Sequence, residues 1–339
     1  MFTKEKIKNI VIFMPRFIGD CINCTPSIKM LKEYYPACRI YLVIREPISK
    51  VLANEEDLNF IYDTRQGNRL KGSLALIKQL GKIDNCACIF MTNTLQDALI
   101  SYLAKNIVRV GYATEQRGVL LTNKLKFDRN RHYINRYAYL ANELCNNQFK
   151  KLPEVSLNHT KNSNILNKSG QIIIGICILS DYKGSRHYPI NQTIEFVGLL
   201  KQTLGESVHF IMLGSKEEQT TAEQVVKGCI EQKNEQVTSL AGKTTIVELI
   251  ADIAALDLLI TVDSGPLHIA AATKTPVVAL HSKGTSPFSL ICPKGTLVNV
   301  VNSRGSYIND SDQIIDLLVE DIVTATLDLI KDIDKKGVI

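Results

Sequence analysis

Short apolar runs alternate with amphipathic segments along most of the chain. In the first half, the runs have the length of strands, and the segments between them repeat apolar residues every three or four positions, as helices do. The strand-length runs are IKNIVIFM, RIYLVI, CACIFM and IVRVGY, and the helical segments include TPSIKMLKEYY and SLALIKQLG. This alternation predicts a parallel sheet made of strand–helix–strand units.

The alternation stops once and then starts again. Residues 150–169 are polar and lack a sustained period, which predicts a linker. Beyond it we expect the strands QIIIGICI, VHFIMLG, LLITV and PVVALHS, and the helices INQTIEFVGLLKQTLG, KEEQTTAEQVVKGCIEQ, TTIVELIADIAALD, GPLHIAAATK and DQIIDLLVEDIVTATLDLIKDIDKK. The pattern predicts an α/β fold of two Rossmann-like, doubly wound parallel-sheet domains facing across a cleft, residues 1–160 and 161–339. The last helix either stays in the second domain or packs back on the first.

The composition is that of a folded protein without a membrane-spanning segment. Apolar residues make up 45% of the 339 residues. No run approaches the roughly 18 uncharged apolar residues that would cross a bilayer. The N-terminal MFTKEKIKN is not followed by the apolar core and cleavage site of a signal peptide, so we expect the protein in the cytoplasm.

The nine cysteines lie at scattered positions, which fits reduced thiols better than a disulfide framework. The close pairs Cys21/Cys24 and Cys86/Cys88 raise the question of zinc. Structural zinc needs four converging nitrogen or sulfur ligands, and neither pair has a second pair at a suitable spacing. We therefore expect no structural metal.

Positive charge is concentrated in the first half of the chain. Residues 1–150 hold 23 Lys+Arg and 13 Asp+Glu, a net charge of +10, whereas the remainder holds 17 and 21, a net charge of −4. This asymmetry fits nucleic acid, an anionic lipid surface or a phosphorylated acceptor, but also a solvated basic face without a partner. No RNA-binding signature or recognition-helix pattern accompanies it, so no nucleic acid is expected. The basic stretches are 64–72 and 124–136.

The segment VDSGPLHIAAATK has the pattern of a strand, a tight turn and a helix. The strand stops at Asp263, Ser264 and Gly265 form the turn, and Pro266 suits the first helical turn because its missing N–H has no partner there. The free amides and the positive end of the helix dipole form an anion site, for which a diphosphate is the natural ligand. The alternative is an ordinary helix, capped by Ser264 and with His268 on a surface turn.

Two further loops follow strands in the same half. GICILSDYKGSRHYPI places Lys183 and Arg186 where cations can stabilise a developing diphosphate charge. MLGSKEEQ places Gly214 and Glu217 after the next strand, where a carboxylate can accept ribose hydroxyls. Three strand-end loops therefore point to one nucleotide site.

The first strand of the chain ends in Gly19-Asp20, and Arg16 lies in the same loop. A strand–glycine–helix junction usually binds an anion, which a carboxylate would repel. Asp20 is therefore either the cap of the following helix or a group that reacts with a substrate.

Four stretches carry a resemblance over nearly the whole length of the chain. They are Gly19-Asp20 with TPSIKMLKEYYP, the RHYP at 186–189, AGKTTIVELIADIAALD at 241–257, and VDSGPLHIAAATKTPVVAL. On these motifs the chain resembles the lipopolysaccharide heptosyltransferases, glycosyltransferase family 9, which have the GT-B fold. The resemblance implies an inverting, metal-independent enzyme without cofactor that transfers heptose from ADP-heptose to a lipopolysaccharide or lipooligosaccharide core acceptor.

The resemblance also implies roles for individual residues. Asp20 would be the general base and Arg186 a catalytic cation, while Arg16 would bind the acceptor. The acceptor would be an anionic, lipid-linked saccharide, and the enzyme would be cytoplasmic and peripheral at the inner membrane. Donor binding would fall to Lys183, Gly214, Glu217, Thr244, Asp263, Ser264, Gly265, Pro266 and His268.

The chain departs from the family pattern at two places. Arg186-His-Tyr-Pro stands where Lys, a variable residue, Trp and Pro are usual, and the loop HSKGTSPF, with His281 and Lys283, replaces the common Phe-Gly-Pro-Thr. A different nucleotide sugar, a different glycan or protein acceptor, or a non-catalytic nucleotide-sugar-binding protein therefore stay open as alternatives.

Overall fold

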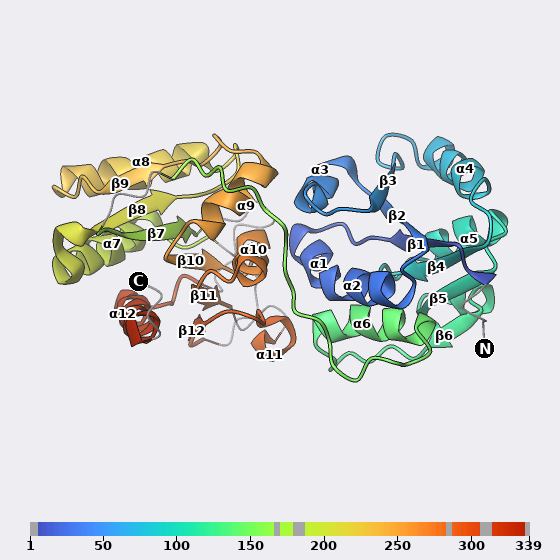
Figure 1. Cartoon of the computed structure of the whole chain (residues 1–339). Helices are drawn as coiled ribbons and strands as arrows, with labels where there is room; N and C mark the ends of the chain where they lie inside the picture. The colour runs from blue at the N-terminus through green and yellow to red at the C-terminus, as the bar shows by residue number, and fades with distance from the viewer. Residues whose placement is uncertain (1–5, 166–169, 179–186, 283–286, 306–313, 336–339) are drawn as a thin grey trace. The chain divides into compact units, whose positions relative to one another are not determined.

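A computed structural model describes residues 6–165, 170–178, 187–282, 287–305 and 314–335. The chain divides into two compact units, Met1–Asn158 and His159–Ile339. Each unit is a parallel sheet covered by helices (Figure 1). The assignment of acceptor binding to the first half and donor binding to the second stays a prediction.

The first unit holds a six-stranded sheet in the order β3-β2-β1-β4-β5-β6, with every neighbouring pair parallel. The order reverses direction between β1 and β4, and at such a point the loops beyond the strand ends diverge and leave room for a ligand. The strands are β1 Asn9–Phe13, β2 Arg39–Ile44, β3 Leu58–Tyr62, β4 Cys86–Phe90, β5 Val108–Tyr112 and β6 Asn123–Leu125.

Helices cover the first sheet because their apolar residues recur on one side. α4 buries Gly72, Leu76 and Leu80 at a spacing of four residues, and Leu76 and Leu80 pack with Val11 and Phe13 of β1. α1, α2 and α6 pack together elsewhere in the unit. The helices are α1 Ile18–Asn23, α2 Thr25–Tyr34, α3 Glu46–Ser49, α4 Arg69–Leu80, α5 Leu95–Leu103 and α6 Tyr133–Leu144.

The second unit repeats this topology. Its sheet has the order β12-β11-β10-β7-β8-β9. Read from β9, with β7 counted as the first strand, this is the strand order of the first sheet. The order reverses direction between β7 and β10. The strands are β7 Ile172–Cys177, β8 Val208–Met212, β9 Val237–Ser239, β10 Leu258–Val262, β11 Val277–His281 and β12 Val298–Asn302. The helices are α7 Ile190–Leu204, α8 Gln219–Glu231, α9 Ile246–Ala254, α10 Gly265–Thr273, α11 Phe288–Ile291 and α12 Val319–Lys335.

The predicted class, α/β with two Rossmann-like parallel-sheet domains, is confirmed. The C-terminal helix is shorter than predicted, because residues 314–316 form a turn and α12 begins only at Val319. α12 packs against α7, β11 and β12 of its own unit, where Ile322 and Leu329 join the core. A separate short helix, α1, also precedes the predicted helix TPSIKMLKEYY.

Hydrogen bonds anchor the middle of the predicted linker at two points. The carboxylate of Glu55 accepts a hydrogen bond from the amide of Asn158, at 2.8 Å. The buried carboxylate of Asp252, in α9, accepts from Ser163 Oγ at 2.8 Å and from the amide of Asn164 at 2.6 Å. Few residues of the segment therefore lie between the two anchors.

Candidate functional site

The predicted donor residues follow strands of the second sheet. Because the strands are parallel, Gly214 after β8, Thr244 after β9 and Asp263 after β10 all lie at one edge of the sheet. The loops after β8 and β9 are tied together, since the amide of Gly242 donates to the carbonyl of Gly214 at 3.0 Å. Lys183 and Arg186 lie outside the described residues.

The N-terminus of α10 has no side-chain cap among the described residues. Ser264 occupies the cap position with extended backbone, but its hydroxyl donates to the carbonyl of Val262 at 3.3 Å. The interpretation of Ser264 as a side-chain cap is therefore wrong. Pro266 lies in the first turn, as predicted. Pro266 has no N–H, and the amide of Leu267 donates to the carbonyl of Ser264 at 3.2 Å, so this turn offers an anion the amide of Gly265 and the positive end of the helix dipole.

His268 does not lie on a surface turn, contrary to the alternative interpretation. It is only 9% exposed, and Leu267 to Ala272 are all buried. The small side chains of Ala270 and Ala271 let the helix pack closely on its neighbours. α10 is therefore held on nearly all sides, so the position of its first turn is fixed.

Two adjacent glutamates after β8 have different surroundings. Glu217 is exposed, and hydrogen bonds with its own backbone and with Ser215 lower the pKa of its carboxyl. Glu218 is 8% exposed, and its Oε2 accepts from the amide of Ser215 at 2.7 Å. A Cβ on Gly214 would lie 2.9 Å from that oxygen, so a side chain there would displace the Glu218 carboxylate that holds the loop. The sequence holds no signal that separates these two carboxylates.

Two residues in the motifs that differ from the family pattern lie in the core of the second unit. His281 is 4% exposed at the end of β11, where its Nδ1 lies 3.1 Å from Asn302 Oδ1 and its ring meets Phe288. Tyr188 is 1% exposed, and its hydroxyl donates to the carbonyl of Leu317 at 2.9 Å. At these two positions the departure from the family pattern therefore places a side chain in the core. Lys283 lies outside the described residues.

Asp20 is not a helix cap, because the cap position of α1 is Phe17 and Asp20 lies inside the first turn. The hydroxyl of Tyr137, in α6, donates to Asp20 Oδ1 at 3.0 Å. Burial, and then the negative charge of Asp20, raise the pKa of Tyr137, so this phenol stays protonated and keeps donating. Burial likewise raises the pKa of the neighbouring Cys21 to about 12, which keeps that thiol neutral.

Four arginines gather at the strand ends of the first unit and line a cavity of about 290 Å³, called here the arginine cavity. Three come from the loops after three strands and Arg69 is the first residue of α4, and the parallel sheet brings these segments to one edge. Only Arg16 among them is predicted from the sequence to be a site residue, although the stretch 64–72 is basic. The lining consists of Arg16 after β1, Arg45 after β2, Asp63, Arg65, Gln66 and Arg69 after β3, and Gln96 in α5.

Two carboxylates offset part of this charge. Arg65 donates to Asp63 through Nε at 2.8 Å and Nη2 at 2.7 Å, and its Nη1 donates to Asp97 at 2.6 Å. Burial alone would lower the pKa of Arg65, but the hydrogen bonds and charges of both carboxylates raise it. Burial, then the charges of Arg16 and Arg65, lower the pKa of Arg45. The excess of guanidinium groups makes the cavity suitable for a carboxylate or phosphate.

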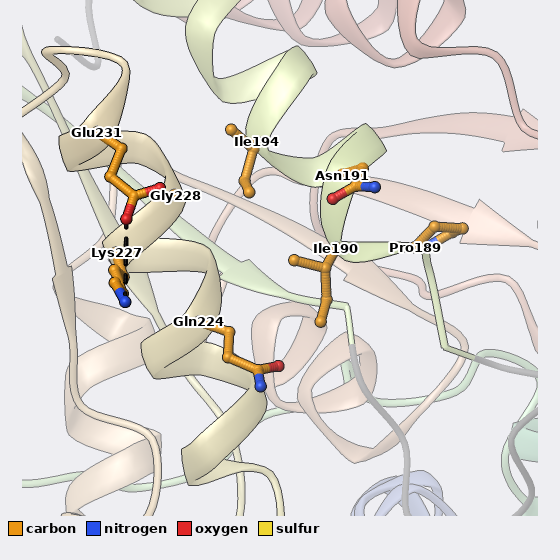
Figure 2. Close-up of a pocket in the computed structure, with 8 residues that line it drawn as sticks. All are labelled: Pro189, Ile190, Asn191, Ile194, Gln224, Lys227, Gly228 and Glu231. Atoms are coloured by element: carbon orange, nitrogen blue, oxygen red, sulfur yellow. Dashed lines mark ion pairs between the residues drawn. The ribbon is translucent and has the colours of Figure 1, made fainter.

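Another hollow of about 480 Å³ lies between α7 and α8 (Figure 2). Its charged lining residues, Lys227 and Glu231, form an exposed ion pair at 3.9 Å. It contains none of the predicted site residues and follows the flanks of two helices, so we assign it no role in the chemistry.

The described part of the chain has no cluster of metal ligands and no membrane-spanning helix. Within residues 6–335, excluding the gaps given above, no three His, Cys, Asp or Glu side chains gather in a way that could hold a metal ion. None of the helices described there is long and apolar enough to cross a membrane.

Residues 73–305 match the model of glycosyltransferase family 9 (heptosyltransferase). The chain is 24% identical over 315 residues to lipooligosaccharide heptosyltransferase 2 of Haemophilus influenzae, covering 87% of this chain and 90% of that protein. Its fold is similar to E. coli ADP-heptose lps heptosyltransferase II, with a TM-score of 0.78, 20% identity, and coverage of 96% and 99%. It is also similar to E. coli heptosyltransferase WaaC with ADP-2-deoxy-2-fluoro heptose, with a TM-score of 0.74, 16% identity, and coverage of 96% and 99%. The family match spans more than half of the chain, which therefore belongs to glycosyltransferase family 9, the heptosyltransferases of lipopolysaccharide biosynthesis.

Proposed function

We propose that this glycosyltransferase transfers heptose from ADP-heptose, with inversion, to a lipopolysaccharide or lipooligosaccharide core acceptor. The uncapped N-terminus of α10, at the point where the second sheet reverses its strand order, carries the proposal. The similar E. coli enzymes, whose names include ADP-heptose or an ADP-heptose analogue, support this choice of donor.

The donor is assigned to the second unit. The positive end of α10 and the amide of Gly265 bind the diphosphate, and the missing side chain of Gly265 lets the backbone approach it. Lys183 and Arg186 stabilise the charge that grows on the leaving diphosphate as the glycosidic bond breaks. The remaining donor contacts are assigned to Gly214, Glu217, Thr244, Asp263, Ser264, Pro266 and His268.

Asp20 is assigned the role of general base. An acceptor hydroxyl attacks the anomeric carbon, its oxygen forms the new glycosidic bond, and ADP leaves from the opposite face with the bonding electrons. The hydroxyl proton passes to the Asp20 carboxylate, and Tyr137 holds that carboxylate in one orientation through its hydrogen bond. No step requires a metal, since cationic side chains and helix amides take the charge of the leaving group.

The arginine cavity is assigned to an anionic group of the acceptor. Arg16 and Arg45 provide positive charge there, while Arg65 is held in place by Asp63 and Asp97. Planar guanidinium groups recognise carboxylate and phosphate through paired hydrogen bonds. The lipid-linked acceptor would therefore bind through a negatively charged sugar or phosphate substituent.

Replacing Arg45 by Gln is expected to raise the KM for the acceptor by roughly 10- to 100-fold, because a charge-assisted contact is lost. The KM for the donor and the affinity for ADP should stay within about twofold. Steady-state kinetics with each substrate varied in turn measures both values. Lys50→Gln, which removes an exposed cation outside the cavity, is the matched control. An unchanged acceptor KM in Arg45→Gln would remove this assignment.

Thermal unfolding with a panel of nucleotides tests the donor. ADP and ADP-heptose at about 100 times their dissociation constant should stabilise the protein by roughly 2.7 kcal/mol and raise its Tm by several degrees. UDP and GDP compounds at the same concentration should have little effect. A shift with UDP-sugars alone would contradict ADP-heptose as donor, and no shift with any nucleotide would contradict a nucleotide-sugar site.

A further inference from the structure

Two neighbouring helices of the first unit carry large apolar side chains on their exposed faces. Sixteen large apolar residues are at least a third exposed in the described part of the chain, and six of them lie on α4 and α5. This concentration is unusual for a solvated helix surface, which is normally polar. The six, called here the α4–α5 face, are Leu70, Leu74, Leu95, Leu99, Tyr102 and Leu103.

The spacing of these residues places them opposite the buried side of each helix. α4 buries Leu76 and Leu80, whereas Leu70 and Leu74 are 78% and 67% exposed. In α5 the residues Leu95, Leu99 and Leu103 recur every four positions, so they share one side of the helix. Both helices are therefore apolar toward the core and apolar toward solvent.

The two helices present one surface rather than two. Gln96, in α5, accepts from Arg69 Nε at 2.9 Å and donates to Ser73 Oγ at 2.8 Å, and both partners belong to α4. α4 and α5 also lie side by side in Figure 1. Hydrogen bonds between the helices thus hold the apolar side chains in a common patch.

Basic residues surround this patch. Lys71 and Lys78 are exposed on α4, and Lys105 is exposed directly after α5. The guanidinium of Arg109 lies 5.4 Å from the ring of Tyr102. α4 contains no acidic residue, and the single acidic residue of α5, Asp97, is 2% exposed and paired with Arg65.

Two acidic residues lie beside this surface. Glu115 accepts a hydrogen bond of 3.3 Å from the amide of Leu95, at the start of α5, and the exposed Asp84 lines a hollow with Lys78, Leu103 and Lys105. The lysines of the patch, Lys71, Lys78 and Lys105, outnumber these two carboxylates. The chemistry of the surface is therefore an apolar centre with a cationic rim.

We propose that the α4–α5 face binds to an anionic lipid bilayer. Leucine side chains enter the boundary between headgroups and acyl chains, while lysines reach the lipid phosphates and Tyr102 lies at headgroup level. A second copy of this chain fits less well, because a symmetric contact would bring two cationic rims together. None of the proposed donor residues lies on the α4–α5 face. The inference rests on the proposed function in one respect, which is the choice of a bilayer as the apolar partner.

Vesicle sedimentation tests the proposal with the full chain. The protein should bind vesicles of phosphatidylcholine with 30% phosphatidylglycerol, and not vesicles of phosphatidylcholine alone, and 0.5 M NaCl should weaken this binding. The double variant Leu74→Glu/Leu99→Glu should bind at least about tenfold more weakly. Ile230→Glu, which changes a 50% exposed apolar residue on α8, should bind as the parent does.

Two further measurements separate this inference from its competitors. Each variant should show the parental Tm, which excludes misfolding, and the parental response to ADP, which tests the donor site independently of the surface. Light scattering should give the same mass for the parent and the double variant. The proposal is overturned if the parent fails to bind anionic vesicles, if the double variant binds them equally well, or if the parent is a dimer that the double variant dissociates.

Discussion

Asp20→Asn is expected to lower kcat by roughly 10²- to 10⁴-fold, because an amide keeps the shape of the carboxylate but cannot take the proton of the acceptor hydroxyl. ADP affinity should be unchanged, since the donor is assigned to the other unit. Rapid-quench measurement of a single turnover, with ADP binding measured by calorimetry, separates chemistry from binding.

A graded series around the same carboxylate makes this test sharper. Tyr137→Phe removes the donor to Asp20 Oδ1 and should reduce kcat by about tenfold, with the acid limb of the rate profile moved to higher pH. Glu33→Gln, an exposed carboxylate on α2, should retain the parental kcat. A parental rate in Asp20→Asn would show that Asp20 is not the base.

Gly265→Val is expected to weaken ADP binding by roughly 100-fold or more. Gly265 is the first residue of α10, and a branched side chain there would occupy the space through which the start of the helix approaches the diphosphate. The matched control is Gly198→Val in α7, where an added Cβ would meet its nearest side chain at an ordinary 3.7 Å. If Gly265→Val bound ADP as tightly as the parent, the diphosphate would have to bind elsewhere.

The strand and the helix on either side of Asp263 and Ser264 are predicted closely from the sequence. LLITV is an uninterrupted apolar run followed by Asp-Ser-Gly-Pro, and the structure has β10 at Leu258–Val262 and α10 from Gly265. Both signals are local, since burial dictates the run and backbone geometry dictates the turn residues. A local pattern cannot show burial of a helix on all sides, which explains the wrong interpretation of His268.

The groups around Asp20 and the arginine cavity could not be found in this way. Tyr137 lies 117 residues beyond Asp20, on a helix that the apolar pattern did not single out. The arginines come from the loops after β1, β2 and β3 and from the start of α4, and only the spatial order of those strands brings them together. Charge excess indicated the half of the chain that holds the arginine cavity, but the pairing of Arg65 with Asp63 and Asp97 depends on tertiary contacts.

The two anchors of the linker limit the hinge available to this protein. Glu55 holds the chain at Asn158 on the first unit, and Asp252 holds it at Ser163 and Asn164 on the second. In this connecting segment, the backbone dihedrals of residues 159–162 are the ones left to absorb a rotation of one unit against the other. The stiffness of this short piece of chain would then affect the rate of any step that requires such a rotation.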